Sequence, residues 1–281
     1  MILKKHLYTP LTAVVLASGA TFTTTSFVST AVQADPAMHS SKYVMEAKNA
    51  KVIRRVLGPL SDSVNGVPAA PVDSFDWAGS EITSVKGTAH FELDPIANTG
   101  RITAEWTDRN GEWTYTQTMF ASPPHPTGLR IGASKSTTTV ITGDPITTNV
   151  SLHGDTGAGG PVIPTLSNLI TTWGPSKVTL NGMAFDNPYD GPAPMWAGHT
   201  MLSEGVRDDG GAVRTESGEI FSMMKKSEGL VYPNKLVFHL VFHDAPGPEM
   251  TDNIPPPLSF FYHVTFSDVD FKIKHDVKHG G

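Results

Sequence analysis

The chain of 281 residues contains no cysteine. Disulfide scaffolds, zinc ribbons, iron–sulfur clusters and thiol catalysis are therefore excluded, and so is a blue-copper centre, which needs a cysteine ligand. Charged residues make up only 17% of the chain, below the roughly 25% of ordinary soluble proteins. Together with 26 glycines and 22 prolines, this scarcity indicates many strands and turns rather than a helical bundle.

Basic residues are also few. Lys and Arg number 21 against 27 Asp and Glu, which gives a formal net charge of −6. Binding to a nucleic-acid backbone needs clustered Lys and Arg, so no nucleic-acid partner is expected. After residue 34 no apolar run reaches the about 20 residues that a membrane-spanning helix needs. No transmembrane segment is therefore expected in the mature chain.

The first residues have the order of parts of an export signal. Lys4 and Lys5 precede a mostly apolar stretch from Leu11 to Ala20, and a Ser/Thr-rich stretch then ends at the small residue Ala34. This pattern is typical of a cleaved secretory signal. We predict a signal peptide over residues 1–34 and a secreted or periplasmic location. An uncleaved N-terminal anchor is the alternative.

Two segments carry apolar residues at helical spacing. The first predicts a helix from Ser40 to Leu57, which Gly58 and Pro59 would end. The second predicts a short central helix over residues 165–173. The apolar residues at positions i, i+3, i+4 and i+7 of the second segment are Leu166, Leu169, Ile170 and Trp173.

Most of the remaining chain predicts strands. Residues 85–94 alternate apolar and polar side chains, as a half-buried strand does. Asn110-Gly111 and Asn181-Gly182 are hairpin signals, since these residues accept the positive φ angles of a tight turn. Further strands are predicted over residues 102–106, 113–119, 177–180, 197–204, 218–223, 235–243, 258–266 and 269–274, and two more within 137–152.

These elements predict a mainly β fold, an antiparallel β-sandwich or barrel-like structure with an N-terminal helix and one short central helix. The two β regions form either one domain or two lobes joined near Gly160. The expected regions are the signal peptide (1–34), the N-terminal helix and linker (35–73), a β-meander region (74–160), a C-terminal β region (161–275) and a tail (276–281).

Histidines near the C-terminus are the most suggestive chemical feature. In the strand predicted over residues 235–243, His239 and His243 share one face, and the opposite face is wholly apolar. If this strand pairs with the next one, His263 faces His239 or His243. Cross-strand neighbours lie about 5 Å apart, a spacing that suits a shared metal ion.

Neighbouring residues extend this possible metal site. His199 and Met201 point the same way on an extended segment, and an imidazole with a thioether suits copper. Asp244 follows His243, and zinc favours histidines with a carboxylate. The candidate ligands of copper or zinc are His199, Met201, His239, His243 and His263. Structural hydrogen bonding is the alternative, since no close-spaced motif such as His-Glu-x-x-His occurs.

A second candidate site would hold a small molecule or a sugar. Trp196 and Tyr189 flank a proline-rich segment, where exposed aromatic rings would stack on a sugar ring. Arg207 and Asp244 add charged groups. In the alternative, Trp196 is buried and anchors its loop, because large aromatic side chains are mostly buried.

The leading functional hypothesis is an exported binding protein that holds copper or zinc through its C-terminal histidines. One alternative is a secreted enzyme that uses the same histidines with Asp in acid–base chemistry on a small molecule or polysaccharide. No Gly-x-Ser-x-Gly elbow supports a serine hydrolase of that type. A surface structural protein without a site is the other alternative.

Overall fold

The computed structural model describes residues 41–57, 62–64, 67–69, 82–124, 127–131, 138–158, 163–188, 195–221, 229–244 and 260–275. All of them belong to one compact unit, residues 39–281. The predicted signal peptide (1–34) and the predicted tail (276–281) lie outside the described residues. The described part contains no helix that could span a membrane.

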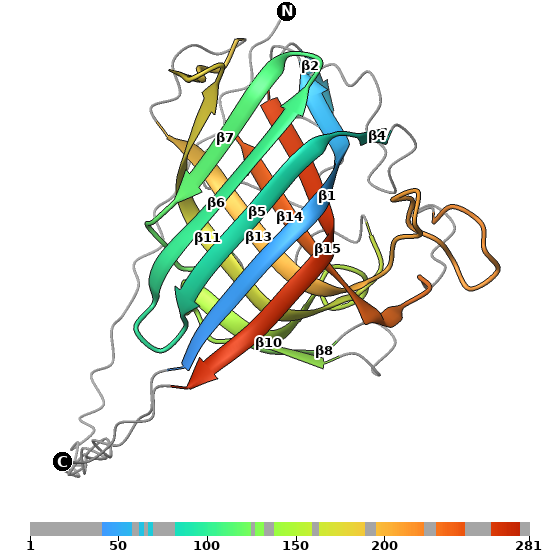
Figure 1. The fold of residues 1–281 in the computed structure, drawn as a ribbon. Helices are drawn as coiled ribbons and strands as arrows, with labels where there is room; N and C mark the ends of the chain where they lie inside the picture. The colour runs from blue at the N-terminus through green and yellow to red at the C-terminus, as the bar shows by residue number, and fades with distance from the viewer. Residues whose placement is uncertain are drawn as a thin grey trace, which may run out of the picture. The chain divides into compact units, whose positions relative to one another are not determined.

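Eight antiparallel strands close into a barrel, which confirms the mainly β prediction and its barrel-like alternative. Each strand pairs with its neighbour along the barrel path, β7 pairs with β11, and the last strand returns to pair with the first. Figure 1 shows this closure, with β1 in blue beside β15 in red. The barrel strands are β1 (Ser41–Leu57), β5 (Lys86–Asp94), β6 (Thr99–Asp108), β7 (Gly111–Gln117), β11 (Leu166–Leu180), β13 (Trp196–Gly205), β14 (Tyr232–His243) and β15 (Phe260–His275).

Shorter strands complete the sheet or form hairpins of their own. β10 pairs with the first half of β11, β12 with its end, and β4 with β1. β2 pairs with β3, and β8 pairs with β9. These strands are β2 (Asp62–Val64), β3 (Val67–Ala69), β4 (Thr83–Ser84), β8 (Gly128–Ile131), β9 (Thr138–Ile141), β10 (Ile146–Leu152) and β12 (Met183–Ala184). The barrel thus draws strands from both predicted β regions.

The helix predicted over residues 40–57 is wrong, because β1 occupies this segment. Its buried side chains fall on odd positions up to Ala47 and on even positions from Ala50. Asn49, which lies between them, adopts a left-handed φ of 54° and produces this switch. The switch breaks the two-residue period of the strand and leaves apolar residues three positions apart, a spacing that a helix also produces.

The short helix predicted over residues 165–173 is also wrong, since this segment is the first half of β11. Ile170 packs inside the barrel, whereas Leu166 and Trp173 pack into a second cluster on the outside. Both faces of the strand are therefore covered by apolar side chains. The polar residues Asn168, Thr171 and Thr172 are buried as well, so polarity does not mark an exposed face, and periodicity alone cannot then separate a buried strand from a buried helix.

Two strand predictions also need correction. Residues 218–221 form no named strand, and Ile220 makes only an isolated bridge with Arg214. The two strands predicted over residues 258–266 and 269–274 are one continuous strand, β15. Its buried side chains also change parity, between Phe266 and Val269, opposite the switch in β1. Ser267 and Asp268, which lie between these positions, are exposed.

The barrel interior is filled by large side chains. Trp106 and Trp113 stack with their ring centroids 6.0 Å apart, and the ring of Tyr262 lies 5.2 Å from that of Trp113. An eight-stranded barrel is just wide enough to be filled in this way. The largest fully buried aromatic residues of the interior are Phe91, Tyr115, Trp196, Phe238, Phe242, Tyr262 and Phe266.

The outside of the barrel is covered along β11 and β13. Residues 206–221, here called the cover segment, place Val206, Val213 and Phe221 in one apolar cluster with Trp173 and Met201. A barrel strand whose outer face is covered in this way is buried on both sides. The cover segment therefore turns part of the outer surface of the barrel into a second, smaller core.

Candidate functional site

The candidate histidines lie on the outer face of three neighbouring strands. His239 on β14 is paired with Met201 on β13 and with Thr265 on β15. Directly paired residues of antiparallel strands point to the same side of the sheet. In the next row, Val241 on β14 separates His199 from His263. The opposite face of β14 packs inside the barrel, as the alternation predicted.

The structure brings His239 and His263 into direct contact. Nδ1 of His239 lies 3.2 Å from Nε2 of His263, and the two ring centroids are 5.4 Å apart. Both side chains are almost completely buried, with exposed fractions of 1% and 3%. The sequence allowed His263 to lie beside either His239 or His243, and the structure places it beside His239.

His239 is held in the neutral form. Burial lowers the pKa of His239 well below its usual range, because the charged ring would lose its hydration. The charge of Arg207 and the nearby imidazoles of His153 and His199 lower this pKa further. A neutral imidazole keeps a lone pair that can bind a metal ion or accept a proton.

His199 is fixed in orientation beside this pair. Its ring stacks on Trp173, with the centroids 5.0 Å apart, and its Nδ1 lies 2.9 Å from the carbonyl oxygen of Thr172. Since a carbonyl only accepts, Nδ1 carries the proton and donates it. The lone pair of His199 is then on Nε2.

His243 does not join the pair. It lies four residues beyond His239 on β14, which is about 13 Å at the usual rise of a strand. Its ring stacks on Phe261, and its Nδ1 bonds the carbonyl oxygen of Asp244. The Asp244 carboxylate accepts a hydrogen bond from the backbone N–H of Phe260 at 3.1 Å. His243 and Asp244 thus belong to the end of the strand rather than to the His239–His263 pair.

Within the described part of the chain, no three His, Asp or Glu side chains lie close enough together to hold one metal ion. The residues that the structure does gather are two imidazoles with the thioether of Met201 on the adjacent strand. This set has two nitrogen donors and one soft sulfur donor.

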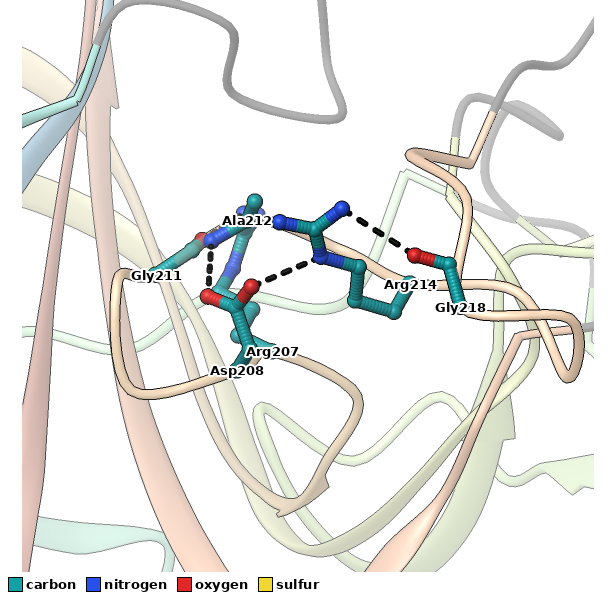
Figure 2. Close-up of polar contacts among 6 residues, drawn as sticks. All are labelled: Arg207, Asp208, Gly211, Ala212, Arg214 and Gly218. Atoms are coloured by element: carbon teal, nitrogen blue, oxygen red, sulfur yellow. Dashed lines mark hydrogen bonds and ion pairs between the residues drawn. The ribbon is translucent and has the colours of Figure 1, made fainter.

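The cover segment is tied together by charged side chains, which Figure 2 shows. One carboxylate oxygen of Asp208 accepts the N–H of Ala212 at 3.0 Å, and the other accepts Nε of Arg214 at 2.7 Å. Arg214 also donates to the carbonyl of Gly218 at 3.1 Å. These bonds more than offset the effect of burial and hold the pKa of Asp208 below its usual value.

Arg207, a predicted ligand-binding residue, begins this network. Its side chain is only 4% exposed, and its Nη1 donates to the carbonyl oxygen of Gly211 at 3.0 Å. It is also close enough to His239 to lower the pKa of that residue. Arg207 therefore belongs to the cover segment and lies within electrostatic range of His239.

Trp196, which the aromatic-site hypothesis expected to be exposed, is buried. Trp196 is 1% exposed and points into the barrel, where its ring stacks on Phe185 with the centroids 5.4 Å apart. Its indole N–H donates to the carbonyl oxygen of Phe185 at 3.0 Å. This is the position that the anchoring alternative expects. Tyr189 lies outside the described residues.

One residue near the site was missed by sequence reasoning. His153 follows β10, has a positive φ of 63°, and contributes to the low pKa of His239. It lies in a glycine-rich connection with no periodic pattern, so no local signal pointed to it. Only the pairing of β10 with β11 brings this connection near β13 and β14.

Comparisons with known proteins assign no family to this geometry. The chain matches no family model, no curated protein and no solved structure. Its function therefore has to be inferred from the chemistry of its own residues.

Proposed function

We propose that the chain is an exported binding protein that holds one copper(I) ion between His239, His263 and Met201. The observation that carries the proposal is the 3.2 Å separation between Nδ1 of His239 and Nε2 of His263. Two nitrogens bound to one tetrahedral ion at about 2.0 Å each lie about 3.3 Å apart. Both rings present these nitrogens as lone pairs when their protons lie on the opposite nitrogens, so binding needs only a change of tautomer.

Met201 supplies the third donor. It is directly paired with His239 across β13 and β14, which places the two Cβ atoms about 4.5–5.5 Å apart on the same face. A thioether is a soft ligand that favours copper(I), and imidazole also suits copper. The flexible side chain of methionine can adjust its sulfur position within a packed cluster.

Two features favour copper(I) over zinc. A zinc site usually takes four ligands from Cys, His, Asp and Glu, and the described residues contain no group of three such side chains. The charge of Arg207 near His239 opposes any bound cation. This repulsion is twice as large for a divalent ion as for a monovalent one at the same distance.

Copper(I) titration of the untagged, exported chain against a chromophoric chelator tests the proposal. We expect one equivalent to bind. Loss of a single outer-shell partner costs about 10–100-fold in metal affinity, so His239→Gln and His263→Gln should each lose more than about 100-fold. Met201→Leu, which keeps the packing volume, should weaken copper(I) binding and leave the fold intact.

His243→Gln is the matched control, because His243 is a buried histidine of the same strand face outside the pair. It should bind copper(I) as the wild type does. Equal binding by wild type and His239→Gln would contradict the proposal. Absence of copper both from the native protein and after titration would also contradict it, and would favour the acid–base or structural alternatives.

A further inference from the structure

A groove of about 610 Å³ opens on the outer surface beside the histidine pair. Its walls come from the turn at the start of the cover segment, from β1 at its change of parity, and from the adjoining parts of β14 and β15. Thr265, the direct partner of His239 on β15, forms part of it. The volume lies within the range of small-molecule sites.

The carboxylates that line this groove have basic side chains beside them. Asp208 is neutralised by Arg214, whose Nε lies 2.7 Å from the carboxylate. Asp209 is paired with Lys235 at 2.6 Å on the exposed rim. Asp268, also on the rim, stands opposite Lys48 in the register of β1 and β15. The carboxylates of the groove therefore have basic neighbours.

Two further cationic residues of the groove, Arg207 and Lys51, lie beside Gly211. Nη1 of Arg207 donates to the carbonyl oxygen of Gly211 at 3.0 Å. A Cβ atom placed at Gly211 would lie 2.9 Å from Cδ of Lys51, so the stem of Lys51 crosses the same residue. Nζ of Lys51 lies 3.5 Å from the hydroxyl oxygen of Ser267. The guanidinium of Arg207 and the stem of Lys51 thus both lie against Gly211, one from the cover segment and one from β1.

We propose that this groove binds the carboxylate or phosphate group of a small organic anion between Arg207 and Lys51. Arginine binds such groups through parallel N–H donors, and lysine adds a mobile point charge. The hydroxyl groups of Ser267 and Thr265 add neutral donors in the same groove. Because Arg207 is almost completely buried, its charge is poorly screened by water and attracts an anion more strongly than a surface arginine does.

This anion site is distinct from the proposed copper site, and its test needs no metal. Isothermal titration calorimetry of the chelator-treated chain compares inorganic phosphate, glycerol 3-phosphate and succinate with uncharged glycerol. Saturable binding of at least one anion, weakened by added salt, is expected, with no binding of glycerol. Preference for the phosphates or for succinate identifies the anionic group.

Lys51→Met keeps the apolar stem at Gly211 and removes the charge, so the affinity should fall about tenfold to a hundredfold. Lys42→Met is the matched control, because Lys42 is a lysine of the same strand that lies outside the groove and pairs with Glu92. His239→Gln should still bind the anion, which separates this proposal from the copper proposal. No binding of any anion, or unchanged binding by Lys51→Met, would overturn it.

Discussion

At the scale of single residues, burial favours the neutral form of His239 and His243. His243 is 8% exposed, and burial lowers its pKa although the hydrogen bond to Asp244 opposes the shift. In the unfolded chain its pKa is about 6.5. As the pH falls below about 6.5, the unfolded state takes up the proton first, and the free energy of unfolding decreases by about 1.4 kcal/mol per pH unit for this group. The loss ends when the folded form is also protonated.

Urea unfolding between pH 7.5 and 5 measures this effect. His243→Gln should show a weaker loss of stability on acidification than the wild type, because one buried neutral imidazole is removed. His90→Gln is the control, since His90 is a surface residue paired with Glu46 across β1 and β5. An unchanged pH dependence in His243→Gln would show that this residue does not titrate between the two states.

The candidate site was predictable from the sequence only where a two-residue period marked the strand. The alternation in β14 placed His239 on the outer face, and strand pairing then brought His263 to it. Contacts made by irregular segments had no such signal. The position of Arg207 beside His239 depends on the fold of the cover segment, and that of His153 on a connection without periodicity.

At the scale of elements, the change of parity in β1 depends on Asn49. Its left-handed φ of 54° costs most L-residues about 1–2 kcal/mol, whereas glycine adopts it without that cost. Asn49→Val should therefore lower the free energy of unfolding by about 1–2 kcal/mol, and Asn49→Gly by less than about 0.5 kcal/mol. Chemical denaturation compares the two variants. An equal decrease in the free energy of unfolding in both variants would show that Asn49 stabilises the fold through its side-chain contacts and not through its backbone conformation.

The parity change in β1 and the burial of β11 on both faces explain why these two segments were predicted as helices, whereas other barrel strands were predicted correctly. β5, β6 and β7 keep one parity throughout, and their alternation was visible in the sequence. β1 changes parity, and the first half of β11 is buried on both faces. In both cases the apolar spacing that remains is shared by helix and strand.

At the scale of the whole molecule, the interior is one core to which all the barrel strands contribute. The ring of Trp113 contacts those of Trp106, Phe242 and Tyr262, which come from β6, β14 and β15. Trp113→Ala should lower the free energy of unfolding by about 3–5 kcal/mol in a single cooperative transition. Met183→Ala, at an exposed apolar residue, is the control and should change little.

That experiment also tests whether the barrel is one unit. If tryptophan fluorescence and far-ultraviolet circular dichroism of Trp113→Ala reported separate transitions, the two β regions would be independent lobes. The sequence left this choice and that between sandwich and barrel open, because closure depends on residues far apart in the chain. Ser41 and His275, which face each other on β1 and β15, are 234 positions apart.

The pairing of β1 with β15 closes the barrel, and it can form only after β15 has been synthesised. β1 leaves the ribosome first among the barrel strands, and β15 leaves last. At about 5–20 residues per second, the 234 positions between Ser41 and His275 take about 12–47 s to synthesise. During that interval β1 has one unpaired edge, and an open edge is a template for another chain. Correct folding of each new molecule therefore requires that its own β15 pairs with β1 before another chain pairs with that open edge.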